Sequence, residues 1–258
     1  MGVLNWLGRR LARYLSEPRG AAHVSTSRPG QLAATLRKGD VLLVEGTSRF
    51  SSAIRTITQS TWSHSALCVG DALAATRGDP APMLVEADIN EGVRTVPIER
   101  YAHLHTRICR PVGLEPREID ALVDYAIARL GQQYDLRNVI DLARYLLHPP
   151  PVPDRYRRRL LALGSGEPTS AICSSLIAAA YASVRYPVLP DIEIAQHEGG
   201  SGEEQVREIL HIRDSRLYAP RDFDVSPYFR IVKPTIEHGF DPRALTWADL
   251  DGGPANAG

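Results

Sequence analysis

Two residues that could form a nucleophilic pair stand far apart in this chain. His64 lies in the stretch 62–70 (WSHSALCVG), whose apolar residues and closing glycine predict a short strand. Cys173 lies near the start of the apolar stretch 171–181, which follows Pro168 and predicts a helix. Only the thiolate form of cysteine attacks a carbonyl carbon efficiently, and a helix N-terminus and a nearby imidazole both favour that form. The pair therefore predicts a cysteine nucleophile with a histidine base, provided that the fold brings the two together.

Each of these residues also has an ordinary structural interpretation. A cysteine in an apolar helix and a histidine in a strand are more often packing residues than catalytic ones, and sequence spacing alone does not join them. The helix start would supply more than a thiol, because its first backbone N–H groups lack partners and can donate to an oxyanion. The sequence patterns by themselves leave the catalytic and the structural interpretation open.

A third group should accept a hydrogen bond from the second ring nitrogen of the histidine and hold the ring in place. Glu86 is our candidate, since it follows the apolar residues 83–85 on a predicted strand, and a carboxylate among apolar residues needs a partner. Asp88 is the alternative, because it lies two residues further along on the same strand face. A purely structural role for Glu86, in a turn or in an ion pair with an arginine, stays open.

The elements that must position these residues change in character along the chain. Short apolar runs bounded by turn residues predict strands in the first half, at 41–44, 62–70, 83–87, 93–98 and 106–109, with a last one at 228–232. Helical spacing predicts helices at 50–58, with Ser48 as N-cap, and at 116–130, 136–147, 155–163, 171–181 and 203–212. Because strands precede helices instead of alternating with them, we expect an α+β fold with a mainly antiparallel sheet packed against helices.

The composition excludes several function classes. Lys and Arg number 30 and so do Asp and Glu, so overall charge gives no argument for nucleic-acid binding, and we predict no nucleic-acid partner. The 3 cysteines form no close pair, which favours a reducing compartment, and we therefore predict a cytoplasmic protein. His103 and His105 alternate on a predicted strand without a third ligand at suitable spacing. We accordingly predict neither a metal site nor a cofactor.

The N-terminal segment has a pattern of its own. Leucines at 4, 7, 11 and 15 recur at helical spacing with arginines between them, which predicts an amphipathic helix followed by a linker up to residue 31. The pattern lacks the unbroken apolar core of a signal peptide. Two interpretations remain open: a helix packed on the domain, or a peripheral contact of residues 1–16 with the inner face of a membrane.

Several short motifs, taken in order, resemble the circularly permuted NlpC/P60 papain-like hydrolases of the YiiX/YebB type. They cover most of the chain between residues 38 and 233, and stand at 39–43 (GDVLL), 60–65 (STWSHS), 85–87 (VEA) with 92–93 (GV), 130–135 (LGQQYD), 172–177 (ICSSLI) and 218–229 (YAPRDFDVSPYF). The chain departs from that pattern in a serine, Ser175, where an acidic residue is common, and in a proline- and arginine-rich insertion near 148–166.

This resemblance implies a papain-like fold in which the histidine strand precedes the cysteine helix. It implies that Cys173 is the nucleophile, His64 the general base and Glu86 the orienting residue, with Tyr134 near the substrate pocket. We also expect the neighbouring Ser63 and Ser174 to contact substrate. The hydrolase domain is expected at 32–240, with the insertion inside it, and a tail without packed structure at 241–258.

Three functions fit these expectations. The first is hydrolysis of an amide or ester through a Cys173 acyl-enzyme, with a cell-wall peptide or a lipid-like amide as substrate. The second is a lipid acyltransferase or phospholipase resembling the lecithin:retinol acyltransferase group, which shares the histidine-before-cysteine order. The third is a papain-like module that binds a ligand without turnover. The predicted partner is accordingly a small-molecule, peptide or lipid substrate, and the sequence does not indicate an oligomeric state.

Overall fold

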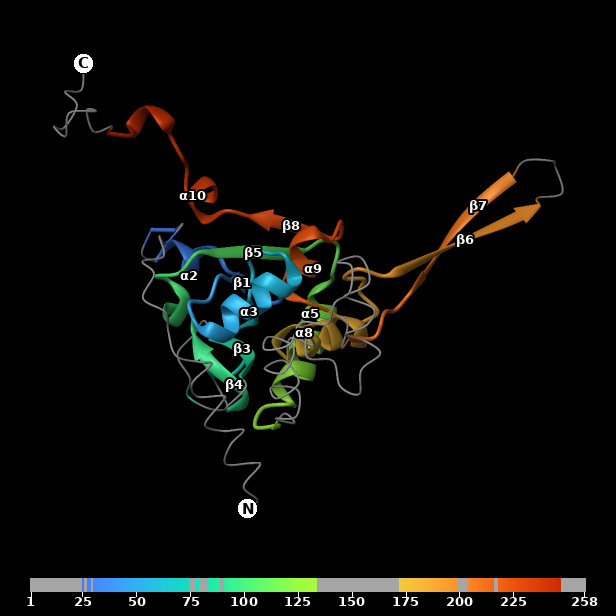
Figure 1. Ribbon diagram of the computed structural model, residues 1–258, viewed down its shortest axis with the longest axis horizontal. Helices are drawn as coiled ribbons and strands as arrows, with labels where there is room; N and C mark the ends of the chain where they lie inside the picture. Colours follow the sequence, from blue (N-terminus) through green and yellow to red (C-terminus); the bar gives the residue numbers. More distant parts are fainter. Residues whose placement is uncertain are drawn as a thin grey trace.

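The computed structural model describes residues 25, 27–28, 30–74, 78, 83–88, 91–133, 172–198, 204–215 and 218–246 (Figure 1). Several sequence predictions lie outside these residues: the N-terminal helix, the helices at 136–147 and 155–163, the insertion at 148–166, Tyr134 and the tail beyond residue 246. Within the described part of the chain, no helix is both long and apolar enough to cross a membrane.

A six-stranded antiparallel sheet forms the centre of the fold, in the order β4-β3-β2-β1-β5-β8. Its strands are β1 (Val41–Val44), β2 (His64–Gly70), β3 (Met83–Asp88), β4 (Gly92–Pro97), β5 (Thr106–Pro111) and β8 (Phe229–Val232). Every residue of β1 is buried, as expected for a central strand with an apolar run on both faces. These strands confirm the predicted α+β fold and antiparallel sheet.

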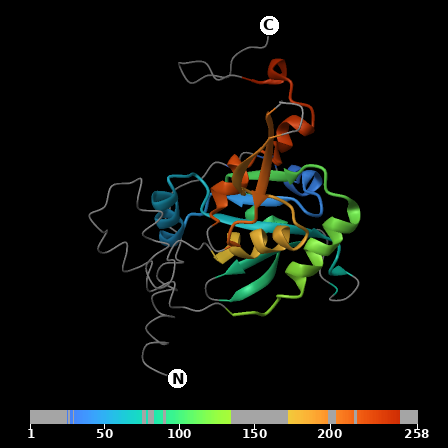
Figure 2. The same ribbon diagram turned by 90° about the vertical axis from the view of Figure 1, so that its right-hand side faces the viewer.

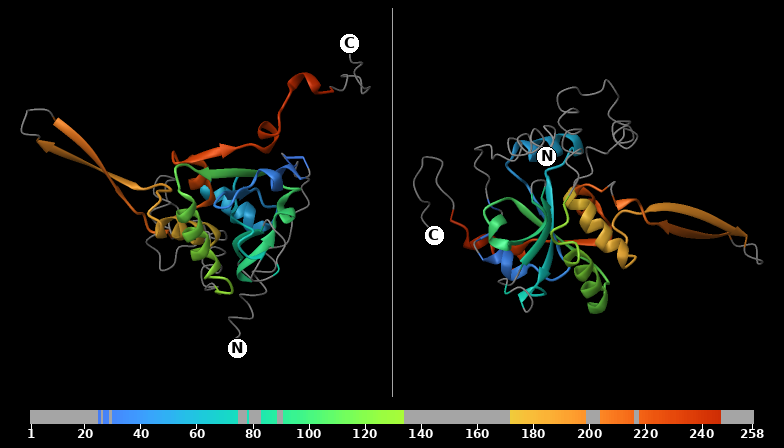
Figure 3. Two further views of the ribbon diagram at one scale, coloured as in Figure 1. Left: turned by 180° about the vertical axis from the view of Figure 1, so that it is seen from behind. Right: turned by 90° about the horizontal axis from the view of Figure 1, so that it is seen from below.

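Helices cover one face of this sheet. The two main ones are α8 (Ile172–Ser183) and α5 (Pro116–Ile127), and both lie on the same side of the strands (Figures 2 and 3). Alternate strand residues such as Leu43, Leu67 and Val85 face this layer and are fully buried with Ile177. This burial fixes α8, and therefore its first turn, against the ends of β2 and β3.

The opposite face of the sheet is covered by shorter segments. The strand residues whose side chains point to this face, such as Leu42 and Ala66, pack against Leu32 of α2 (Gln31–Thr35) and Tyr101 of η1 (Ile98–Tyr101). The short helices α9 (Pro220–Val225), α10 (Pro234–Glu237) and η3 (Pro242–Ala244) complete the described elements. Tyr101 is thereby held beneath the sheet at the end where β2 begins.

Helix α3 (Arg49–Thr58) confirms the helix predicted at 50–58 and its cap. The Ser48 hydroxyl accepts a hydrogen bond from the backbone N–H of Ser51 at 3.0 Å, which satisfies one of the unpaired donors of the first turn. Helix α5 confirms the helix predicted at 116–130, although its regular part ends at Ile127. Gly131 then adopts the left-handed conformation, with φ of 83°, and its N–H bonds to the carbonyl of Val93.

The helix predicted at 203–212 is wrong. Residues Glu204–His211 form strand β7, which pairs antiparallel with β6 (Asp191–Glu198) in a two-stranded hairpin that projects from the domain (Figures 1 and 3). The apolar spacing of this short segment fits both the 3.6-residue period of a helix and the two-residue period of a strand. Pairing with β6, which supplies backbone partners along its whole length, decides the outcome.

Candidate active site

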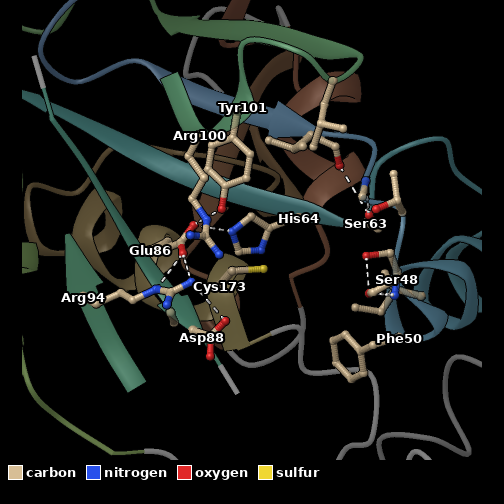
Figure 4. A pocket seen from close by; sticks show the side chains of 17 residues that line it. Ser48, Phe50, Ser63, His64, Glu86, Asp88, Arg94, Arg100, Tyr101 and Cys173 are labelled. Carbon is tan, nitrogen blue, oxygen red and sulfur yellow. Dashed lines mark hydrogen bonds and ion pairs between the residues drawn. The ribbon is translucent and has the colours of Figure 1, made fainter. Parts of the chain in front are cut away.

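Cys173 occupies the first turn of α8. The helix begins at Ile172, so the backbone N–H groups of its first turn have no intrahelical partners. Leu176 and Ile177 anchor the helix in the core one turn later. The thiol is 5% exposed and opens into a cavity shared with His64 and Glu86 (Figure 4).

His64 joins the other two residues. It is the first residue of β2, and its ring lies beside Cys173 in the cavity that both residues line (Figure 4). Its Nε2 lies 2.8 Å from Oε2 of Glu86. Since Nε2 is taken by the carboxylate, Nδ1 is the nitrogen left for proton exchange with sulfur. The structure thus brings together three side chains that come from β2, β3 and α8.

Glu86 has an almost completely buried carboxylate, 1% exposed, with partners on both oxygens. Oε1 accepts a hydrogen bond from Arg94 at 2.9 Å, and Oε2 accepts one from the Tyr101 hydroxyl as well as contacting His64. The alternative candidate, Asp88, instead contacts Arg94 at 3.3 Å. Burial alone would raise the pKa of Glu86, but His64, Tyr101 and Arg94 lower it to about 2. The carboxylate therefore stays ionised throughout the neutral range.

The pKa values of the cysteine and the histidine move in opposite directions. Burial opposes ionisation of Cys173, but the adjacent His64 and hydrogen bonds from Ser65 lower the pKa of the thiol below its ordinary 9.0. Burial likewise opposes protonation of His64, yet Tyr101, Cys173 and Glu86 raise the pKa of its ring well above 6.5. Both shifts favour the thiolate and imidazolium together, which is the reactive form of such a pair.

The two serines expected at the substrate are placed differently. Ser63 lines the cavity, although its buried side chain accepts a hydrogen bond from the Gly46 N–H at 2.9 Å. Ser174 is fully buried and does not line the cavity; its hydroxyl lies 3.2 Å from that of Ser65 and 3.9 Å from the Cys173 sulfur. Ser174 thus packs beside Cys173 in the interior, whereas we had expected it to contact substrate. The way in which α8 packs on β2 decides this, and no local sequence pattern gives that packing.

The cavity has a volume of about 250 Å³. Hydroxyl groups and the first turn of α3 line one side, the catalytic candidates lie in the middle, and two arginines and Tyr101 line the other (Figure 4). Its lining residues are Val44, Gly46, Thr47, Ser48, Phe50, Ser51, Ile54, Ser63, His64, Glu86, Ala87, Asp88, Arg94, Arg100, Tyr101, Leu104 and Cys173. Arg94, Arg100 and Tyr101 were not among the predicted site residues. Strand pairing of Arg94 with Glu86 gives a signal for the first of these only once the register is known.

No cluster of three metal-ligating side chains occurs among the described residues. His105, a candidate ligand together with His103, places its Nδ1 3.0 Å from Oε2 of Glu45, and its ring centroid lies 5.0 Å from that of Trp62 with the rings tilted by 55°. The described cysteines are all free, and burial raises the pKa of Cys68 to about 12. Cys68 and Cys109 are therefore poor nucleophiles, in contrast to Cys173.

Comparison with known proteins gives a family match over part of the chain. The model of the permuted papain-like amidase enzymes (YaeF/YiiX, C92 family) matches residues 35–145, a segment that contains His64 and Glu86 and ends before Cys173. The fold is permuted papain-like. The match supports an amidase, or more broadly a hydrolase, and it names the YaeF/YiiX family, which is related to NlpC/P60 but distinct from it.

A solved structure is also similar to this chain: the metalloprotein yiiX from Escherichia coli O157:H7. The two chains are 16% identical, with 76% of this chain and 96% of that chain covered and a TM-score of 0.44. No curated protein matches this chain.

Proposed function

We propose that this protein is a cysteine hydrolase that cleaves an amide or ester bond through an acyl-enzyme on Cys173. The observation that supports it most is the continuous chain of contacts from Cys173 through His64 to the buried Glu86, at the wall of a cavity. The opposite pKa shifts of the thiol and the imidazole accord with this role, since a retired site would have no reason to keep the ionised pair.

In the proposed first step, the Cys173 thiolate attacks the substrate carbonyl carbon and a carbon–sulfur bond forms. The oxygen gains negative charge, which unpaired N–H groups at the start of α8 can stabilise. The His64 imidazolium then gives its proton to the leaving nitrogen or oxygen as the bond from carbon to that atom breaks. An acyl-enzyme and a free amine or alcohol result.

In the second step, neutral His64 takes a proton from water, and the water oxygen attacks the thioester carbon. Collapse of the intermediate breaks the carbon–sulfur bond and releases the acid and the thiolate. Glu86 orients the imidazole and stabilises its protonated form, and Tyr101 holds Glu86 in place through its hydroxyl. Phe50, Ile54 and Leu104 give the cavity an apolar wall suited to a small amide, a peptide or a lipid-like acyl chain.

Alkylation by iodoacetamide near neutral pH tests the activated nucleophile. We expect Cys173 to react about tenfold faster than a free thiol, because its lowered pKa raises the fraction present as thiolate near neutral pH. The intact mass would count the labels and peptide mapping of a digest would locate them, with Cys68 and Cys109 as internal controls. A Cys173 rate no higher than that of free cysteine would contradict the proposal.

Turnover needs a separate measurement. The protein is incubated with a mixed set of amides, esters and lipids, and intact mass is followed for an acyl adduct. We expect the adduct on the native protein and its absence from Cys173→Ala. Hydrolysis that persists in Cys173→Ala would show that another group performs the chemistry.

A further inference from the structure

The two arginines of the cavity differ in how their charges are balanced. Arg94 contacts three carboxylates, those of Glu86 at 2.9 Å, Asp88 at 3.3 Å and Glu91. Its positive charge is therefore fully offset within the protein. Arg100 lines the same cavity, but among the residues that the structure describes no ion pair joins it to a carboxylate.

The position of Arg100 is fixed by its neighbour. Arg100 precedes Tyr101 in η1, and Tyr101 is buried with its hydroxyl on the Glu86 carboxylate. The backbone of Arg100 is thereby anchored, while its own side chain is exposed and lines the cavity that His64 and Glu86 also line (Figure 4). The side chain can thus meet a ligand without disturbing the core.

Apart from Arg100, the cations of the described lining already have anionic partners. The His64 imidazolium lies between the Cys173 thiolate and the Glu86 carboxylate, so this group adds no free positive charge to the cavity. Arg100 is then the cation of the described lining that is available to an incoming anion. A guanidinium binds a carboxylate through two parallel N–H···O hydrogen bonds, which fixes orientation as well as charge.

We infer that Arg100 forms an anion subsite beside Cys173, and that the substrate carries a carboxylate a few bonds from the carbonyl that is attacked. This inference rests on the proposed hydrolase function and names its substrate class. Phe50, Ile54 and Leu104 contact the uncharged remainder of such a substrate. Arg100 is here a specificity-determining residue and takes no part in proton transfer.

Alkylation by two reagents of similar size tests the subsite without knowledge of the substrate. Iodoacetate carries a carboxylate and iodoacetamide carries none. The rate of Cys173 alkylation by iodoacetate divided by the rate by iodoacetamide therefore measures the attraction of the site for an anion. We expect Arg100→Gln to lower this ratio about two- to fivefold, and Arg100→Lys to lower it less because the charge remains. Added salt should reduce the ratio of the native protein, since the site is open to solvent.

Arg230→Gln is the matched control. It makes the same change of charge at an exposed residue of β8, outside the cavity lining, and should leave the ratio unchanged. An unchanged ratio in Arg100→Gln, or an equal fall in Arg230→Gln, would overturn the subsite. If iodoacetamide itself labels native Cys173 no faster than a free thiol, the proposed function fails instead, which keeps the two failures distinct.

A substrate pair gives a second readout. One substrate is the monoanilide of succinic acid, whose free carboxylate lies near the anilide carbonyl. The other is the same anilide with a primary amide in place of the carboxylate. We expect native protein to prefer the acid in kcat/KM, mainly through KM, and Arg100→Gln to lose the preference while it retains cleavage of the amide form. Equal kcat/KM for both compounds in the native protein would overturn the inference.

Discussion

The ionisation of Cys173 and that of His64 influence one another, and the directions of their pKa shifts determine the expected pH dependence of activity. Activity should rise as pH increases through the pKa of Cys173, which lies below 9.0, because the thiolate forms there. It should fall as pH increases through the pKa of His64, which lies above 6.5, because the imidazolium that protonates the leaving group is lost. Initial rates against pH should give a bell-shaped curve. A single rise near the pKa of a free thiol, about 8.5, would contradict the ion pair.

Ser65 makes a testable contribution to the thiolate. Its side chain is fully buried, hydrogen-bonds Cys173 and is itself in contact with Ser174. Hydrogen bonds to charged groups contribute about 1.5–3 kcal/mol, so Ser65→Ala should raise the pKa of Cys173 by about one to two units. Alkylation rate against pH measures this shift. Ser175→Ala is the matched control, since the Ser175 hydroxyl has no described partner, and an equal shift there would refute a specific role for Ser65.

The site residues differ in how far the sequence could reveal them. Glu86 could be predicted because it is a carboxylate among apolar strand residues, and His64 because it is an imidazole on a predicted strand within a family motif; the pairing of β2 with β3 brings the two together. Arg94 could not be found in this way, because its role depends on standing opposite Glu86 in the β3–β4 register. Arg100 and Tyr101 depend on the turn that η1 makes beneath the sheet, which has no clear sequence pattern.

At the scale of elements, the site depends on how firmly α8 is packed. Ile177 is fully buried one turn after Cys173. Ile177→Ala should lower the free energy of unfolding by about 2–5 kcal/mol, because it leaves a cavity under the helix that carries the nucleophile. Urea denaturation measures the change. Ile236→Ala removes the same atoms from a side chain that is 61% exposed and should change stability by less than about 0.5 kcal/mol. Similar losses in both variants would contradict this account of the core.

The elements that were predicted well are those with a strong local pattern. The apolar run of β1 and the capped helices α3 and α5 need no distant partner to be recognised. The short apolar pattern of β7 predicts a helix as readily as a strand, and only pairing with β6 decides between them. The strand order, in which β8 joins β5 at the edge, likewise depends on contacts distant in sequence and could not be read from local patterns.

At the scale of the whole molecule, we propose from the sequence that residues 1–16 bind a membrane surface. Flotation with vesicles that contain anionic lipid should carry the full chain upward, because the leucine face enters the interface and the arginines contact headgroups. A chain that lacks residues 1–16 should stay at the bottom. Replacement of Arg9, Arg10 and Arg13 by Gln, which keeps the length, should weaken flotation. An absence of binding in the full chain would favour a helix packed on the domain and a soluble substrate.

The order of the site residues along the chain has a consequence for biosynthesis. The proposed base and its orienting acid belong to β2 and β3, whereas the proposed nucleophile belongs to α8, and β8 completes the sheet edge later still. A nascent chain that has released only its first half from the ribosome thus holds the proposed base and acid without Cys173, the proposed nucleophile. In the proposed mechanism, catalytic competence is consequently a late event of translation, and a truncated product that stops before α8 would have no catalytic activity even if its strands had paired.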